Sequence, residues 1–355
     1  MGPMMHGQGC GVQQFKLPCH YQPALPPLVV KAILCTRHGP PESLELLEVA
    51  APCAGAGEVL IKVEAAGVNF PDTLIIEGRY QFRPEPPFSP GAEVAGKILA
   101  VGTGVEGLAI GAPVIATLTW GGYAEQVVAQ AANVTLLPSG IDPGVAAAFT
   151  LVYGTSFHAL RDRAQLSGGE TLLVLGAAGG VGLAAVELGA LMGARVIAAA
   201  GSAERLQVCK RQGAHHLINY ETENLRETVR GITDGKGVDV VYDAVGGRHS
   251  EAAFRSLDWG GRHLVVGFAA GEIPRLALNL PLLKGASLVG VFWGDFVRRD
   301  PQRHQANMNQ LLSWLANGHV RPLVSRRYPL EAAPQALRDL LERRIQGKAV
   351  IMMPA

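Results

Sequence analysis

The sequence has few cysteines and no long hydrophobic run. Its 355 residues include five cysteines, none of them in a Cys-x-x-Cys pair: Cys10, Cys19, Cys35, Cys53 and Cys209. This spacing argues against a disulfide framework or a zinc ribbon and favours a reducing compartment, either the cytoplasm or the mitochondrial matrix. No apolar run reaches the ~18 residues that a membrane span needs, so we expect no membrane partner.

Charged and aromatic residues are also scarce. Charged residues make up 17% of the chain and the net charge is +1, so we expect no nucleic-acid partner. Aromatic residues make up 6%, whereas there are 44 glycines, a composition that suits α/β folds with helices lying close to sheets. The length exceeds that of one ordinary core, which predicts two domains.

The first part of the chain has the pattern of short strands. Residues 1–28 are irregular and rich in glycine and proline, and we interpret them as an uninformative leader. The β-branched segments that follow are bounded by Gly and Pro, which favours a partly open barrel. Strands are predicted at 58–68, 92–102, 112–118 and 122–129.

From residue 142 onward, helical segments alternate with apolar strands, which predicts a parallel sheet covered on both faces. Strands are expected at 171–177, 195–201, 215–220, 238–246, 261–268 and 287–293, and helices at 143–164, 181–192, 203–212, 303–317 and 332–344. A last strand at 348–353 is expected to return to the first region. The fold class is therefore α/β, with a domain of residues 151–290 inserted between 29–150 and 291–355.

Residues 172–182, LLVLGAAGGVG, run from an apolar strand into the start of a helix. Glycine lets the main chain approach a ligand closely, and the helix N-terminus offers free N–H groups to a pyrophosphate. The spacing is A-x-G-x-x-G, with Ala177 in place of the usual first glycine. Because strand, turn and helix occur in order, we predict a dinucleotide site rather than a structural turn. Its predicted contacts are Gly176, Ala177, Ala178, Gly179, Gly180 and Val181.

The end of the next strand indicates which dinucleotide is bound. An acidic residue there would bind the ribose of NAD, but the strand ends in two alanines, Gly201 and Ser202. A guanidinium at Arg205 can pair with a 2′-phosphate, to which Ser202 can donate a hydrogen bond. The alternative is that Arg205 is an ordinary surface residue. Glu204 is the nearest acid and is expected to point outward, so the missing acid favours NADPH.

A set of motifs in fixed order resembles a known family. Along the chain these are AAGVNFPD, GRY, PFSPGAEVAGKILAVG, GGYAEQVV, GAAGGVG, INY and GGRHLVVGF. Together they resemble the medium-chain dehydrogenase/reductase superfamily, in particular its zinc-free quinone oxidoreductase (ζ-crystallin-like) branch, over about residues 30–355. The resemblance implies a GroES-like β-barrel catalytic domain with an inserted Rossmann domain, and a cofactor in the cleft between them.

The resemblance also implies chemistry without a metal. Zinc-dependent members carry a Cys ligand where this chain has Asn69 and a His ligand where it has Ala92, and no four-cysteine cluster exists for structural zinc. Without a Lewis acid, alcohol chemistry is disfavoured. The expected reaction is hydride transfer from NADPH to quinones or α,β-unsaturated carbonyl compounds, with hydrogen-bond donors at the substrate oxygen.

Three residues are implied for the catalytic site. Asn69 corresponds to a family asparagine near the nicotinamide ribose and the substrate carbonyl, and Asp72 corresponds to its partner in the same loop. Tyr80 corresponds to a pocket tyrosine that serves as proton donor in related enoyl thioester reductases. Turn formation by Asn69 and Asp72, and simple packing by Tyr80, stay open as alternatives. Leu74 and Ile76 replace polar residues of some members, which predicts a more apolar pocket.

The resemblance adds cofactor contacts, most of them at the carboxyl ends of parallel strands. Thr155 is implied near the carboxamide and phosphates, and Tyr220 near the adenosine phosphate. The other implied contacts are Ala244, Val245, Val266, Gly267, Phe268 and Lys348. Ordinary core packing is the alternative for the two aromatic residues.

The apolar stretch 287–296, SLVGVFWGDF, is expected at the edge of the parallel sheet. Family members pair this edge across a two-fold axis, so the resemblance implies a homodimer. Two other functions remain open: an enoyl thioester reductase, and a protein that binds NADPH without catalysis, in a structural or nucleic-acid-binding role.

Overall fold

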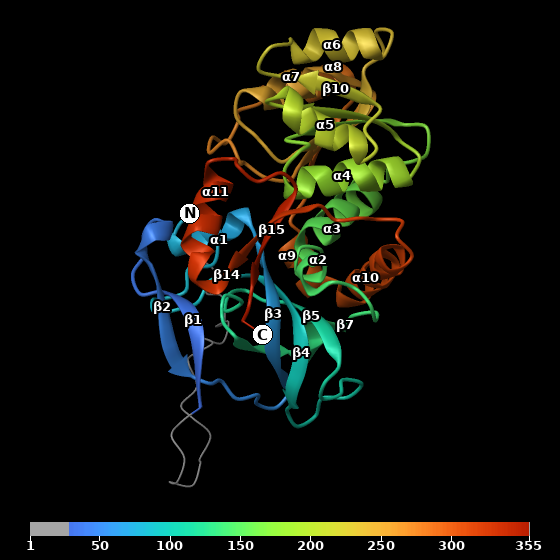
Figure 1. Ribbon diagram of the computed structural model, residues 1–355. Coiled ribbons are helices and arrows are strands. Elements are labelled where there is room, and N and C mark those ends of the chain that lie inside the picture. The colour runs from blue at the N-terminus through green and yellow to red at the C-terminus, as the bar shows by residue number, and fades with distance from the viewer. Residues whose placement is uncertain (1–27, 355) are drawn as a thin grey trace, which may run out of the picture.

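The computed structural model describes residues 28–354 and consists of two parts, one above the other in Figure 1. All of the predicted leader except Leu28 lies outside the described residues, as do Cys10 and Cys19. The lower part consists mainly of strands, whereas the upper part has helices packed around a sheet. This architecture confirms the predicted α/β fold class.

A seven-stranded sheet forms the lower part, in the order β14-β15-β3-β4-β5-β7, with β6 paired to β3. The strands are β3 (Glu58–Val68), β4 (Glu93–Val101), β5 (Pro113–Thr117), β6 (Gln126–Gln130), β7 (Val134–Leu136), β14 (Val324–Pro329) and β15 (Lys348–Met352). Alternate residues of β3, such as Val59 and Ile61, are fully buried in the barrel core. β15 pairs antiparallel with β3, which confirms that the last strand returns to the first region.

Further elements complete the barrel part. β1 (Val29–Cys35) and β2 (Leu44–Ala50) form a separate antiparallel hairpin. α1 (Phe70–Ile76) packs against α11 (Ala333–Leu341). Single 3₁₀ turns occur at Pro41–Ser43, Ala131–Asn133 and Leu330–Ala332. The hairpin and α1 were not predicted, although a Pro in the first turn after Asn69 is a helix-start signal.

The upper part contains a six-stranded sheet in the order β10-β9-β8-β11-β12-β13, in which every pair is parallel. The strands are β8 (Thr171–Leu175), β9 (Arg195–Ala200), β10 (His216–Asn219), β11 (Val238–Asp243), β12 (Leu257–Val265) and β13 (Ser287–Gly290). In β8, Leu172 and Val174 face one apolar cluster, and Leu173 and Leu175 face another. The sheet is therefore buried on both faces, as its continuous apolar strands predict.

Helices cover both faces of this sheet (Figure 1). They are α4 (Gly180–Leu191), α5 (Ala203–Arg211), α6 (Leu225–Ile232), α7 (His249–Arg255) and α8 (Asn279–Lys284). Among residues 28–354, no helix combines the length and the apolar character that crossing a bilayer requires.

The helix predicted at 143–164 is interrupted, which corrects the prediction. α2 (Pro143–Ala147) ends at Ala148, α3 (Thr150–Phe157) follows it, and His158–Arg163 form a π-helical turn. The interruption frees the main-chain N–H of Leu151, which donates to Glu93 Oε2 at 2.8 Å. The break between α2 and α3 thus provides a main-chain donor for the Glu93 carboxylate of the barrel part.

The strand predicted at 287–293 is also shorter than expected. β13 ends at Gly290, and α9 (Trp293–Arg299) follows, because Asp295 in its first turn accepts hydrogen bonds from Arg298 and Arg299. α10 (Pro301–Ala316) then packs on α3 through an edge-on contact between the Trp314 and Phe157 rings. The domain boundaries at 150/151 and 290/291 stay predictions.

Candidate active site

The glycine turn lies between β8 and α4, as predicted. Gly176 has a φ of +63°, a conformation that side chains disfavour. A Cβ on Gly182 would lie 2.2 Å from the Gly176 carbonyl oxygen, and a Cβ on Gly176 would lie 2.7 Å from Val245 Cγ2. The close approach of helix to strand therefore requires glycine at both positions. The twelve-residue helix α4 directs its N-terminal N–H groups toward the turn.

The turn also touches the barrel at the start of β15. Gly347 N donates to Ala178 O at 2.8 Å, and a Cβ on Gly180 would lie 3.1 Å from Lys348 Cδ. Gly179 and Gly347 form an isolated parallel bridge between the two parts. The proposed phosphate-binding turn and the first residue of β15 therefore form one continuous surface.

Lys348 has a buried ammonium group whose three donors are all used. Its side chain is 5% exposed, and Nζ donates to Val68 O at 2.8 Å, to Asn69 Oδ1 at 2.5 Å and to Glu93 Oε1 at 3.0 Å. The Glu93 side chain, on β4, is 1% exposed. Glu93 lies within one of the family motifs, but its pairing with Lys348 was not predictable from local sequence, because the two residues are 255 positions apart.

The Asn69 amide joins the members of this ion pair. Its Nδ2 donates to Glu93 Oε1 at 2.9 Å and to Gly67 O at 3.4 Å, while its Oδ1 accepts from Lys348. The orientation of the amide follows from its partners, since an ammonium can only donate and a carboxylate only accepts. Both N–H groups of Asn69 are thus directed into the protein, and its role toward a substrate stays a prediction.

Asp72 lies beneath the same loop. Its Oδ2 accepts from Asn69 N and from Tyr123 Oη, each at 2.8 Å. Burial raises the pKa of Asp72 to about 7, even though these hydrogen bonds favour the charged form. Burial likewise raises the pKa of Tyr123 well above its usual value. These contacts fit a residue that orders the loop as the partner of Asn69, and a part of Asp72 in the chemistry stays a prediction.

Tyr80 has a half-buried ring that packs against Phe82, with 6.1 Å between the ring centroids. Within residues 28–354 its hydroxyl has no hydrogen-bond partner. Burial, and then the negative charge of Asp72, raise its pKa. The Tyr80 hydroxyl is therefore free to donate, and its role as a proton donor stays a prediction. Ile76 lies in the barrel core, so it does not make the pocket more apolar as predicted, whereas Leu74 is partly exposed.

The opposite end of the proposed cofactor site lies at the carboxyl end of β9. Ser202 caps α5 by accepting from Arg205 N at 3.4 Å. The Tyr220 ring packs on His249, with 4.4 Å between centroids. The positive charge of Arg343 also acts on the Tyr220 phenol. Arg343 was not among the predicted contacts, because it follows α11, in the other part of the molecule.

One expectation about this end is wrong. No carboxylate was expected beside Gly201, but Glu221 lies there: a Cβ on Gly201 would be 4.0 Å from Glu221 Oε1. Glu221 follows β10, so the acid reaches the end of β9 from the neighbouring strand.

The remaining implied contacts are distributed along the same edge of the sheet. Thr155 lies on α3, whose Ser156 Oγ donates to Val181 O at 2.8 Å. The other implied contacts were expected at the last residues of two strands, but they lie in the segments that directly follow β11 and β12. They are Ala244, Val245, Val266, Gly267 and Phe268. Phe268 is exposed.

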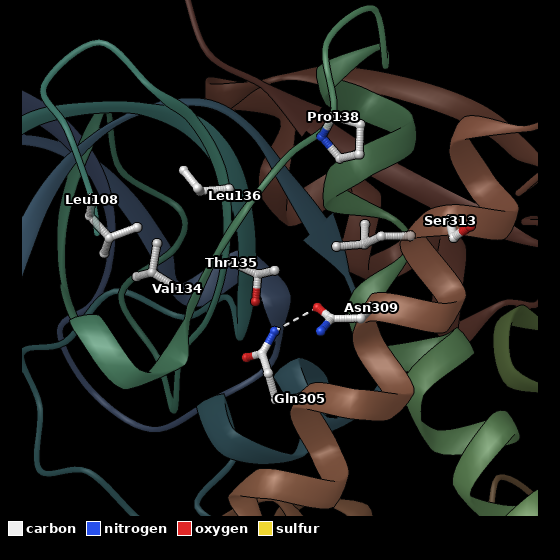
Figure 2. A pocket seen from close by; sticks show the side chains of 9 residues that line it. Leu108, Val134, Thr135, Leu136, Pro138, Gln305, Asn309 and Ser313 are labelled. Carbon is white, nitrogen blue, oxygen red and sulfur yellow. Dashed lines mark hydrogen bonds between the residues drawn. The ribbon is translucent and has the colours of Figure 1, made fainter. Parts of the chain in front are cut away.

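A separate groove lies between β7 and α10 (Figure 2). It encloses about 500 Å³. On the α10 side, Gln305 Nε2 donates to Asn309 Oδ1 at 2.9 Å. No residue of the predicted site lines this groove, and we assign it no part in the chemistry.

Comparison with known proteins places the chain in a family. Residues 55–156 match the family described as alcohol dehydrogenase GroES-like domain, and residues 180–317 match the one described as zinc-binding dehydrogenase. The quinone oxidoreductase-like protein 2 homolog of Nematostella vectensis is 36% identical over 324 residues, covering 90% of this chain and 88% of its own. The chain belongs to the medium-chain dehydrogenase/reductase superfamily.

Other members of the superfamily agree. The Mus musculus quinone oxidoreductase-like protein 2 is 35% identical, covering 91% of this chain and 92% of its own. The crystal structure of Escherichia coli quinone oxidoreductase complexed with NADPH has a TM-score of 0.86 and 30% identity, covering 91% and 99% of the two chains. The predicted GroES-like and Rossmann-type fold is thereby confirmed.

The zinc implied by one of the matching family names does not fit the residues present. Among the described residues, no group of three or more His, Cys, Asp or Glu side chains could hold a metal ion. At the position of the expected ligand, the Asn69 amide is bonded to the Lys348 ammonium, and Ala92 offers no ligand atom. A cation of the protein itself thus neutralises Glu93.

Proposed function

We propose that the protein is an NADPH-dependent, zinc-independent oxidoreductase that reduces quinones or α,β-unsaturated carbonyl compounds. The observation that carries the proposal is the glycine turn, which admits no Cβ and adjoins the buried Lys348–Glu93 pair. Relatives named quinone oxidoreductase-like protein 2 and the Escherichia coli quinone oxidoreductase solved with NADPH support it.

The cofactor would lie along the carboxyl edge of the parallel sheet. The main-chain N–H groups of the turn at 176–181 would hold the pyrophosphate. Ser202 and Arg205, together with Arg343, would hold the 2′-phosphate, since a guanidinium binds phosphate oxygens in a bidentate manner. The residues from 244–245 and 266–268, with Thr155, would line the path to the nicotinamide.

When bound, NADPH supplies a hydride to the conjugated system of the substrate. Negative charge then collects on the substrate oxygen, where a positioned donor stabilises it. The Tyr80 hydroxyl is the group that can donate a proton there. Lys348 and Asn69 fix the loop beneath the site, because their polar groups are already bonded to each other and to Glu93.

Cofactor titration with Arg205→Ala tests the proposal. Loss of the guanidinium is expected to weaken NADPH binding about tenfold while leaving NADH binding nearly unchanged, because only NADPH carries the 2′-phosphate. Quenching of cofactor fluorescence would give both dissociation constants. Arg211→Ala, an exposed arginine on the same helix, is the matched control and should leave both constants unchanged.

Turnover is tested by following NADPH absorbance with quinones, enones and an enoyl thioester. Oxidation of NADPH with quinones or enones is expected. Turnover of the thioester alone would assign the site to enoyl thioester reduction. Binding of NADPH without turnover of any substrate would contradict the proposed activity and favour the non-catalytic alternative.

We also propose a homodimer through the edge of the parallel sheet. β13 is one of the two edge strands, and large apolar side chains lie on it, on α8 and directly before α8: Leu288, Leu282 and Leu278 are 45%, 77% and 80% exposed. A second copy would cover them by extending the sheet. Sedimentation at micromolar concentration is expected to show a dimer, and Leu282→Glu a monomer. Ile110→Glu, on an equally exposed barrel residue, should remain dimeric, and a monomeric unmodified protein would refute the proposal.

A further inference from the structure

The carboxylate of Glu221 lies beside Gly201, close to the strand end at which dinucleotide-binding folds distinguish two cofactors. A Cβ on Gly201 would lie 3.6 Å from Glu221 Cγ and 4.0 Å from its Oε1. In dinucleotide-binding folds, an acid at the end of this second strand accepts hydrogen bonds from the ribose hydroxyls of NAD. The same charge repels a 2′-phosphate. Glu221 thus opposes the preference for NADPH that Arg205 and Ser202 are predicted to give.

Arg248 masks this negative charge. Its Nη2 donates to Glu221 Oε2 at 2.6 Å, and the two side chains are 70% and 42% exposed. An ion pair at the surface is only weakly held, because water screens it and both side chains lose freedom by pairing. Arg248 can therefore leave Glu221 when a more highly charged partner is present.

Positive groups predominate around Tyr220. The guanidiniums of Arg343, Arg205 and Arg248 and the carboxylate of Glu221 act on the pKa of its phenol, and the Glu204 carboxylate next to Arg205 accepts a hydrogen bond from Gln346 at 2.7 Å. A phosphate monoester, which carries about −1.5 to −2 at neutral pH, suits such a group of guanidiniums. His249 packs on the same ring, and burial followed by the charge of Arg248 lowers its pKa, so it adds no charge at neutral pH.

We propose that Glu221 and Arg248 together set the cofactor selectivity of this protein. The inference rests on the proposed NADPH-dependent function. When NADPH binds, Arg248 leaves Glu221 and joins Arg205 and Arg343 as a ligand of the 2′-phosphate. When NADH binds, Glu221 accepts a hydrogen bond from the 2′-hydroxyl of the ribose. Arg248 stays paired with Glu221 and neutralises the charge of its carboxylate. The pair lets the site accept NADH and limits its preference for NADPH.

Dissociation constants for NADPH and NADH, measured by fluorescence titration of the full chain, test the pair. Glu221→Gln is expected to increase the preference for NADPH over NADH about tenfold, because a repulsive charge and a ribose acceptor are lost together. Arg248→Gln is expected to decrease that preference by a similar factor, since it removes a phosphate ligand and unmasks Glu221. Glu227→Gln, an exposed acid on the nearby helix α6, is the control for loss of one negative charge.

The outcomes separate this inference from the proposed function. If the unmodified protein binds neither cofactor, both fail. If it binds NADPH but Glu221→Gln changes the preference no more than Glu227→Gln does, only the selectivity role fails. The role also fails if Glu221→Gln and Arg248→Gln shift the preference in the same direction. Opposite shifts, with an unchanged control, support it.

Discussion

Replacing Lys348 by methionine is expected to lower the free energy of unfolding by about 3–5 kcal/mol, because a buried carboxylate loses its only cation among the described residues. Methionine keeps much of the volume of the lysine stem, so the loss reflects charge rather than a cavity. The substitution also leaves Asn69 Oδ1 and Val68 O without their donor. Urea unfolding of the two proteins measures the difference.

Two further variants identify the cause of that loss. Lys97→Met removes an exposed lysine whose pairing with Glu64 is 3.5 Å long, and it is expected to cost less than about 1 kcal/mol. Adding Glu93→Gln to Lys348→Met should recover part of the loss, because the unpaired charge is then gone. If Lys348→Met were as stable as Lys97→Met, the Lys348–Glu93 pair would have no structural importance.

Tyr80→Phe is expected to lower kcat about a hundredfold or more while changing KM little, because general acid catalysis contributes about 10²–10⁴-fold. The ring and its packing on Phe82 remain, so the change isolates the hydroxyl. Steady-state kinetics with NADPH and the best substrate of the panel would measure the effect.

The control for this variant is another barrel tyrosine. Tyr328 donates to Asp339 Oδ2 at 2.6 Å, away from the glycine turn, so Tyr328→Phe should leave kcat unchanged. An unaltered kcat in Tyr80→Phe would assign that residue to packing, the alternative that its sequence context left open. The proton would then have to come from solvent or from the loop at Asn69.

The parts of the fold that follow from local pattern were predictable from the sequence. The apolar strand β8, the glycines at 176 and 182 and the helix after them are contiguous, so strand, turn and helix could be read directly. The return of β15 was predictable because a final apolar segment needs a sheet to pair with. The segment 291–293 was predicted wrongly, since its apolar residues suit an edge strand, whereas a helix begins at Trp293 with Asp295 in its first turn.

The parts of the site that depend on tertiary contact were not predictable. Glu93 and Lys348 are separated by 255 residues and meet only when β15 joins β3. Glu221 lies beside Gly201 although it follows the next strand, and burial raises the pKa of the Tyr220 phenol while the charge of Arg343, far along the chain, lowers it. Each of these residues has an unremarkable local context, so sequence spacing alone gives no signal for it.

The main-chain link between Gly347 and Ala178 has a mechanical consequence. It joins the two parts beside the glycine turn, and the hydrogen bond from Gln346 Nε2 to Glu204 Oε1 joins them again at the start of α5. The residues just before β15 are therefore tied to both ends of the proposed cofactor path. A substitution that displaces them would disturb the binding of the pyrophosphate and of the 2′-phosphate together.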